Sequence, residues 1–320
     1  MLVRTGLSTP GTGADPGSSA AGSSGISLLD NMLTTFLNNA ATGLPLAALI
    51  VASGTALLIS LHRKSPFWSP GNIMASVFIL AALTHMAFGH TGHFFRYEAY
   101  LVAIGLFVSA CIIPEVTAAP AGGLAGTGRK RIVMTVLALS SVPALFLLTS
   151  RSMTSLEQTP IAGRNIYEQQ YQMGLFLQRY YPDDAVVLND IGAVSFLTRV
   201  RLLDLVGLAN IDVLRLKRAG EYDAGHIQAL CRQYGAGIAI VYDSWLRRVD
   251  SRGGPLPWTK VGEWRIHGNV ICSDDVVSLY AVQDSEREAL LRNLRSHSSR
   301  LPENVVQTGP YTEESIPDRR

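Results

Sequence analysis

Hydrophobic and polar positions divide the chain into two parts near residue 150. Four long apolar segments precede this point, at 44–61, 72–89, 99–119 and 132–150. Each comes close to the roughly 20 residues that an α-helix needs to cross a bilayer. The pattern therefore predicts a membrane region over 43–150, an α-helical bundle with about four spanning helices.

After residue 151, short apolar runs alternate with segments of helical spacing. Runs rich in β-branched or aromatic residues predict strands, and apolar residues three or four apart predict helices. The expected strands are 185–188, 200–205, 237–242, 258–267 and 276–282, and the expected helices are 165–181, 192–198, 222–234 and 285–297. This alternation predicts a small three-layer α/β soluble domain over 151–297, with a mixed edge to its sheet.

The two ends of the chain differ in composition from the rest. Residues 1–25 are rich in Gly, Ser, Ala, Thr and Pro, and 298–320 are mostly polar, which predicts a disordered tail at each end. The segment 26–42 places apolar residues such as Leu29 and Leu33 on one helical face. We expect an amphipathic helix there, lying on the membrane surface or packing on the bundle.

Basic residues predict the orientation of the membrane region. The loop after the first apolar segment holds His62, Arg63 and Lys64, and residues 129–131 are Arg-Lys-Arg. Because short loops rich in Lys and Arg stay in the cytoplasm, both loops belong there, and the N-terminus and the α/β domain belong outside. The expected location is the cytoplasmic (inner) membrane, crossed several times, with an extracytoplasmic C-terminal domain.

Composition narrows the classes of function. The chain is 48% hydrophobic and 16% charged, with a formal net charge of +2. Its basic residues are scattered and form no stripe, so a nucleic-acid partner is not expected. Cys111, Cys231 and Cys272 match no zinc spacing. Cys111 lies in an apolar segment, which leaves open whether Cys231 and Cys272 pair. The sequence contains no phosphate loop, G-x-S-x-G elbow or H-E-x-x-H helix, so we predict no metal and no cofactor.

The most polar spot of the membrane half is the loop GHTGHFFRYEAY at 89–100. It concentrates His90, His93, Arg96 and Glu98, and a guanidinium beside titrating histidines suits the phosphate of a lipid-linked substrate. The alternative is that the aromatic residues of the loop form an interfacial belt while its charges rest among lipid headgroups. Two histidines three apart have no evident third ligand for a metal.

A second group of polar residues follows the first two strands of the α/β domain. If 185–188 and 200–205 are parallel strands of a β-α-β unit, Asp190 and Asp204 lie near their carboxyl ends, the edge where open α/β sheets bind ligands. Asn189 and Asn210 flank them, so the four are candidates for acceptor binding. The alternative is structural: Asn189 or Asp190 caps the following helix, and Asp204 pairs with an arginine such as Arg201.

The same two segments carry a family resemblance. NDIG at 189–192 and DLVGL at 204–208 resemble the periplasmic C-terminal domain of some bacterial polytopic membrane glycosyltransferases of the GT-C superfamily. The likeness covers about residues 165–283, and the preceding helices are similar to the last membrane spans of that family. It implies sugar transfer from a polyprenyl-phosphate donor to an acceptor glycan at the outer face of the cytoplasmic membrane.

The resemblance also implies an incomplete enzyme. GT-C enzymes have more membrane helices and carry their catalytic acidic residue in the first external loop, and nothing before residue 44 corresponds to that loop. We therefore expect a C-terminal portion whose catalytic half is missing or separately encoded, and which is inactive alone. The alternative function is a non-catalytic, membrane-anchored protein whose external α/β domain binds a glycan or a partner protein.

Overall fold

The computed structural model describes residues 25–62, 64–92, 94–117, 126–246, 249 and 254–312. They belong to two compact units: one is Ser23–Glu157, and the other contains Gln158–Arg320. Helix α5 (Gly126–Ile166) runs through the boundary between them. The predicted disordered N-terminal tail, apart from Gly25, lies outside the described residues, as do Arg63 and His93.

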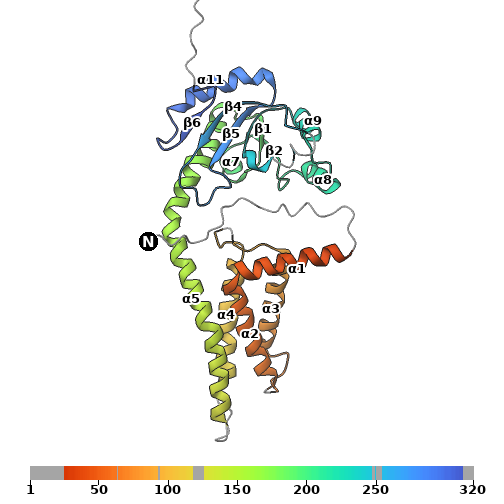
Figure 1. The fold of residues 1–320 in the computed structure, drawn as a ribbon, viewed down its shortest axis with the longest axis vertical. Coiled ribbons are helices and arrows are strands. Elements are labelled where there is room, and N and C mark those ends of the chain that lie inside the picture. The colour runs from red at the N-terminus through yellow and green to blue at the C-terminus, as the bar shows by residue number, and fades with distance from the viewer. Residues whose placement is uncertain are drawn as a thin grey trace, which may run out of the picture. The chain divides into compact units, whose positions relative to one another are not determined.

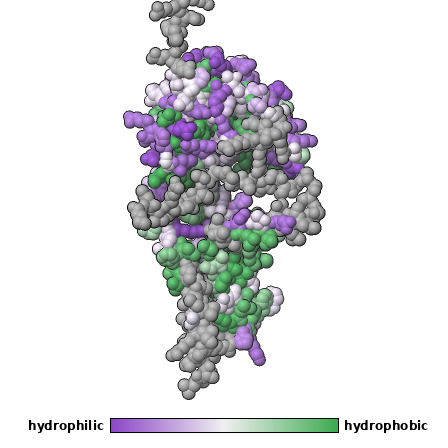
Figure 2. Space-filling model, viewed as in Figure 1, coloured by the Kyte–Doolittle hydropathy of each residue, from purple (hydrophilic) through white to green (hydrophobic). Residues whose placement is uncertain are grey.

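The first unit is helical. Its elements are α1 (Gly25–Thr42), α2 (Leu44–His62), α3 (Pro70–Phe88), α4 (Ala99–Thr117) and the first part of α5. Leu46, Phe78, Leu101 and Ile112 are buried among α2, α3 and α4. Many other apolar side chains of these helices are exposed, and Figure 2 shows hydrophobic residues gathered on this part of the surface.

Two of the described helices, α2 and α3, are long and apolar enough to cross a membrane. Sequence periodicity predicted about four such helices. Within the described residues, the apolar stretch of α4 covers only Ala99–Ile112, which is shorter than a span. The structure thus supports two spans by length and composition.

Helix α1 confirms the helix expected over 26–42, and its Asn39 side chain ties it to the loop after α3. Asn39 is buried; its Nδ2 donates to the carbonyls of Met86 (2.8 Å) and Gly89 (3.0 Å), and its Oδ1 accepts from the Thr91 N–H (3.1 Å). Leu33 is 57% exposed on the same helix. The amide therefore fixes the end of α1, while an apolar side chain of the helix faces outward.

The second unit is built on a six-stranded mixed sheet (Figure 1). Its order is β2-β1-β3-β5-β4-β6, with β1 parallel to β2 and β3 and the other pairs antiparallel. The strands are β1 (Ala185–Leu188), β2 (Arg201–Asp204), β3 (Ala236–Val241), β4 (Thr259–Arg265), β5 (Val276–Ala281) and β6 (Val306–Thr308). The predicted β-α-β unit and mixed sheet are confirmed.

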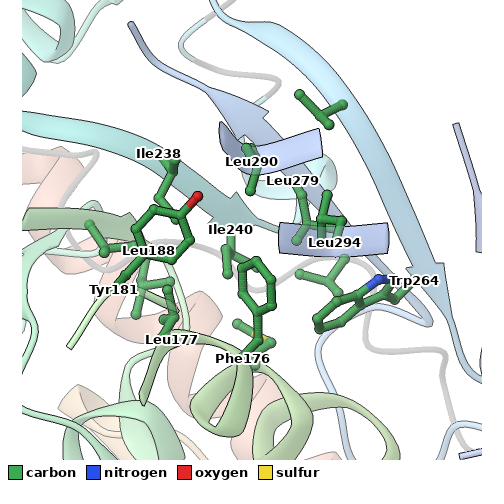
Figure 3. Close-up of a cluster of buried hydrophobic side chains, with 14 of the residues drawn as sticks. Phe176, Leu177, Tyr181, Leu188, Ile238, Ile240, Trp264, Leu279, Leu290 and Leu294 are labelled. Carbon is green, nitrogen blue, oxygen red and sulfur yellow. The ribbon is translucent and has the colours of Figure 1, made fainter. Parts of the chain in front are cut away.

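Helices cover both faces of this sheet, which confirms the three-layer architecture. On one face lie α6 (Gln172–Tyr180), α7 (Gly192–Leu197) and α11 (Arg287–Ser298), and on the other lie α8 (Ile211–Ala219) and α9 (Ala224–Tyr234). Alternate residues of the central strands serve the two cores: Val186 and Leu188 point to the first, and Val187 points to the second. Figure 3 shows the first core, where helix and strand side chains meet: Phe176, Leu177, Ile238, Ile240, Trp264, Leu279, Leu290 and Leu294.

The predicted C-terminal tail begins too early. We expected disorder from 298, but β6 pairs with β4, and Tyr311 is 3% exposed. The Tyr311 hydroxyl accepts a hydrogen bond from Trp264 Nε1 (3.0 Å), and its ring fills the space above Gly262, where any side chain would overlap it. The polar composition of the segment concealed a strand because few of its residues are apolar. The α/β unit extends to Thr312 at least.

Candidate functional site

The topology of the sheet marks the carboxyl ends of β1 and β3 as its candidate ligand edge. After β1 the chain enters α7, whose Val194 is buried on the first face. After β3 it turns to the other face, where Leu246 and Val249 are buried. Neighbouring parallel strands whose connections leave toward opposite faces mark a topological switch point, where open α/β sheets bind ligands.

Asn189 closes the gap between these two strand ends. It is 4% exposed; its Oδ1 accepts the N–H of Tyr242 (3.0 Å), and its Nδ2 donates to the carbonyl of Tyr242 (3.0 Å). Both ends of the amide are therefore occupied by backbone. The suggestion that Asn189 or Asp190 caps α7 is wrong, because the cap position is Ile191 and no side chain caps this helix.

Asp204 and Asn210, two other predicted acceptor-binding residues, stabilise the backbone around them. Asp204 is fully buried, and its two oxygens accept the N–H groups of Val206 (2.8 Å) and Ala209 (2.9 Å). It makes no ion pair with Arg201 among those of the described residues. Asn210 caps α8 by accepting the N–H groups at the start of that helix.

Asp190 is the member of the predicted set that is partly exposed, at the end of a buried polar network. Gln170 Nε2 donates to Asp190 Oδ2 (3.1 Å) and to the Tyr242 hydroxyl (2.9 Å), and that hydroxyl donates to Gln169 Oε1 (2.7 Å). Burial, with the charge of Asp190 second, holds the pKa of Tyr242 well above its usual value. The phenol is therefore neutral, and its contacts fix the strand end.

The two glutamines of this network lie on an irregular helix turn. Residues Tyr167–Tyr171 form a π-helical segment that joins α5 to α6 without a break. Gln169 also donates to the Asp274 carbonyl (3.1 Å), so the helix contacts the loop before β5 as well as β3. Such π turns are frequent at functional sites. Here the turn aims consecutive polar side chains at the carboxyl edge.

A polar hollow of about 440 Å³ lies at the same edge, beside the switch point. It is formed where β3 and β4 end and β5 begins, and its lining is Asp243, Ser244, Glu263, Arg265, Asp274, Asp275, Val276 and Ser278. Four carboxylates against one guanidinium make it acidic. The pattern of apolar runs did not identify these residues, although Asp243 directly follows one predicted strand, and Asp274 and Asp275 directly precede another.

The acidic groups of the hollow are organised by Lys260 and by hydroxyl donors. Lys260 Nζ lies 2.7 Å from both Asp243 and Glu263, and Asp243 also accepts from Ser278 (3.0 Å) and Tyr280 (2.9 Å). Burial acts to lower the pKa of Lys260, but its two carboxylate partners outweigh burial and raise it. The ammonium therefore stays charged and fixes one wall of the hollow.

Asp274 and an exposed ion pair also line the hollow. Burial alone would raise the pKa of Asp274, but hydrogen bonds from Ser244 and the backbone lower it. Arg265 Nη1 and Asp275 Oδ2 lie 2.9 Å apart, with nearly half of each side chain exposed. These two side chains are open to a ligand.

The external loop predicted in the helical unit has a different arrangement from the one expected. Glu98 is 1% exposed and accepts from Arg151 Nη1 (3.0 Å) and from the Gly92 N–H (2.8 Å), so its ion-pair partner is Arg151. Arg96, two residues before Glu98, instead lies over the Tyr97 ring. The partner was missed because it is 53 residues away, on α5.

The loop itself is held in an unusual conformation. Phe94 and Phe95 both have positive φ angles of about 60°, which non-glycine residues rarely adopt, and the Arg151 guanidinium lies 4.8 Å from the centre of the Phe95 ring. His90 is exposed and contributes its carbonyl to His85 (2.8 Å). The structure thus brings Glu98 together with Arg151 and leaves Arg96 and His90 at the surface. His93 lies outside the described residues.

Metal binding and a disulfide find no support among the described residues. No group of three or more His, Cys, Asp or Glu side chains there is arranged to hold a metal ion. Cys231 and Cys272 are free, and they belong to the cores on opposite faces of the sheet, so the pairing that the sequence left open does not form. Burial raises the pKa of the Cys272 thiol to about 12, which makes it unreactive.

Comparison with known proteins gives one match. The sequence model of a family described as "Domain of unknown function (DUF8728)" matches residues 164–280. These residues run from the end of α5 into β5 and contain the network and the hollow, but they are less than half of the chain. No curated protein and no solved structure matches.

Proposed function

We propose that this chain is the C-terminal portion of a polytopic membrane glycosyltransferase that takes its sugar from a polyprenyl-phosphate donor, and that its α/β unit binds the acceptor glycan. The hollow at the carboxyl edge of the sheet carries the proposal. It lies beside the topological switch point, and exposed charged side chains line it. The NDIG and DLVGL segments of the resemblance build this same edge.

The chemistry of the hollow suits a neutral or cationic sugar. Sugar hydroxyls are hydrogen-bond donors, and a carboxylate accepts from them in short, charge-assisted bonds. In the exposed Arg265–Asp275 pair, the Asp275 carboxylate can accept hydrogen bonds from a sugar, and the Arg265 guanidinium can donate them. An acidic glycan or a free phosphate is disfavoured, because the four carboxylates of the hollow outnumber its two cations, Arg265 and Lys260.

The membrane part of the proposal keeps the four predicted spans. Helices α2 and α3 are long and apolar enough; α4 and the apolar part of α5 are proposed as the third and fourth, which places the α/β unit outside the cytoplasmic membrane. The exposed side chains of His90 and Arg96 are proposed to hold the phosphate of the lipid carrier. His93 is part of the same proposal.

The catalytic base is proposed to come from a separately encoded half. A base must reach the acceptor hydroxyl, whereas Glu98 is buried and occupied by Arg151 and a backbone N–H. Substitution Glu98→Gln is then expected to loosen the loop without removing a chemical step. Sugar transfer by the isolated chain that disappears in Glu98→Gln would contradict this assignment.

A glycan array tests the acceptor site. The full chain in nanodiscs should bind a subset of neutral cell-envelope glycans, and Arg265→Ala should weaken binding about ten-fold or more, because a hydrogen bond to a charged group contributes about 1.5–3 kcal/mol. The control is Arg287→Ala, which removes a similarly exposed ion pair from α11. Binding that prefers acidic glycans, or that Arg265→Ala leaves unchanged, would refute the proposed site.

The second candidate is a non-catalytic, membrane-anchored glycan-binding or partner-binding protein. The ion pair of Glu98 with Arg151 favours this candidate, because it occupies the acidic side chain of the predicted external loop. Both candidates predict ligand binding at the hollow. They differ in the effect of deleting the chain: sugar transfer in the cell is lost if the chain is part of a glycosyltransferase, and continues if it only binds a glycan or a partner.

A further inference from the structure

The loop after β2 presents an apolar tip to the outside. Leu208 is 83% exposed and Ile211 is 55% exposed. The seven residues between Asp204 and Asp212, LVGLANI, carry no charge. Isolated exposed apolar residues are ordinary on protein surfaces, so the tip has meaning only if the fold holds it in place.

The fold does hold it in place, with a buried carboxylate. Asp204 accepts the backbone N–H groups of Val206 and Ala209, on either side of the tip, through its two different oxygens. Gly207 has a φ of +83°, in the left-handed region that favours glycine, and its N–H bonds the Asp204 carbonyl (3.2 Å). These contacts fix the turn so that Leu208 points away from the core.

The base of the loop is fixed as well. The Tyr222 hydroxyl donates to the Leu205 carbonyl (2.9 Å), and Asn210 caps α8 directly after the tip. A Cβ atom on Gly207 would lie 3.2 Å from the Leu214 backbone nitrogen, so the turn is packed against α8. A loop tied down by two buried polar side chains and a tyrosine, with a leucine at its apex, is a preformed contact element.

We propose that the exposed apolar side chains of this tip, Leu208 and Ile211, insert into the surface of a lipid bilayer. The proposal rests on the membrane part of the proposed function. The occupant follows from the chain itself: α5 continues without a break from the helical unit, which contains α2 and α3, into the α/β unit. The α/β unit is therefore tethered to helices that suit a bilayer, and an uncharged apolar tip matches the boundary of headgroups and acyl chains.

The attraction is apolar and not electrostatic. Helix α8 carries Arg215, Lys217 and Arg218 against Asp212, but Glu221 and Asp223 follow directly, so the region has no net charge. The tip should therefore enter zwitterionic lipid as well as anionic lipid, and salt should not displace it.

Spin-label accessibility in phosphatidylcholine nanodiscs tests this directly. The full chain carries Leu208→Cys in a Cys111→Ala background, because the other two cysteines are 1% exposed and do not label. The control label is Glu288→Cys, at an exposed position of helix α11. We expect the label at 208 to collide more with oxygen than with a water-soluble nickel complex, and the label at 288 to show the reverse.

Three results would overturn the proposal, and each has its own cause. Equal, water-like accessibility at 208 and 288 means that the tip stays in solvent. Shielding of position 208 from both reagents means that it packs on protein, such as another copy of this chain. If the chain does not enter nanodiscs, it is not anchored in a membrane and the proposal is wrong. If only the acceptor-binding proposal is wrong, the glycan array shows no binding while the labels give the expected result. Adding Asp204→Ala should increase label mobility and reduce oxygen contact, because the tip is no longer fixed.

Discussion

Asn189→Ala distinguishes a structural role from a ligand-binding role at the switch point. In the folded protein the amide joins the end of β1 to the backbone of Tyr242 through two hydrogen bonds of 3.0 Å each. The Tyr242 carbonyl keeps a second partner in the Trp245 N–H (3.1 Å). Among the hydrogen bonds of the described residues, the Tyr242 N–H has no other partner, so its loss dominates.

The magnitude follows from these contacts. An orphaned buried N–H costs about 1–3 kcal/mol, and the lost bond to the carbonyl about 0.5–1.5 kcal/mol, so Asn189→Ala should destabilise the α/β unit by about 2–4 kcal/mol. For a unit of this size the melting temperature should fall by about 5–15 °C. Asn210→Ala, which removes an ordinary helix cap, should cost only about 1 kcal/mol.

Thermal unfolding followed by tryptophan fluorescence is the assay, since Trp258 and Trp264 are both buried in the α/β unit. The melting temperature of Asn189→Ala should lie clearly below that of Asn210→Ala, and both should lie below that of the wild type. If Asn189→Ala melts at the wild-type temperature, or no lower than Asn210→Ala, the amide is not a structural clamp. It would then return to the list of ligand-binding candidates.

The remaining predictions concern the unit boundary, the topology and the pH dependence. An α/β fragment ending at Thr312 should unfold cooperatively, whereas one ending at His297 should not, because β6 and the buried tyrosine after it are lost; equal melting curves would restore the shorter boundary. Reporter fusions after Arg63 and Arg129 should report cytoplasm, and a fusion after Arg164 the outside; the inverse pattern would remove the glycosyltransferase reasoning. Burial lowers the pKa of His297 to about 4, so the free energy of unfolding should fall as the pH drops from 6.5 toward 4, by up to about 1.4 kcal/mol per pH unit. Denaturant titrations should not show this loss in the His297→Leu variant.

The sequence predicts the sheet well because local signals and burial agree there. The run AVVL at 185–188 is apolar and β-branched, and as a central strand it is buried on both faces. Strand β6 was not predicted because Val-Gln-Thr at 306–308 is short, with Val306 and Thr308 exposed and only Gln307 partly buried. Its pairing depends on β4 and on the space above Gly262, and neither is a local property.

The sequence predicted a site at the carboxyl edge of the sheet, but none of the four residues that it named lines the hollow. The β-α-β pattern placed Asp190 and Asp204 at the carboxyl edge, where they lie. Asp204 turned out to hold its own loop, because the geometry of a five-residue turn decides whether a carboxylate faces backbone or solvent. The hollow was missed because β3, β4 and β5 contribute to it, and only the order of strands in the sheet brings Asp243 beside Asp274.

The proposal that this chain serves in sugar transfer is tested most directly in cells that encode it. Membranes from a strain lacking the chain are given a radiolabelled polyprenyl-phosphate sugar, and incorporation into glycan is compared with the wild type. We predict that incorporation is lost without the chain and restored by the wild-type chain and by Arg287→Ala, but not by Arg265→Ala. Equal incorporation with and without the chain would contradict the glycosyltransferase proposal and leave the glycan-binding or partner-binding function.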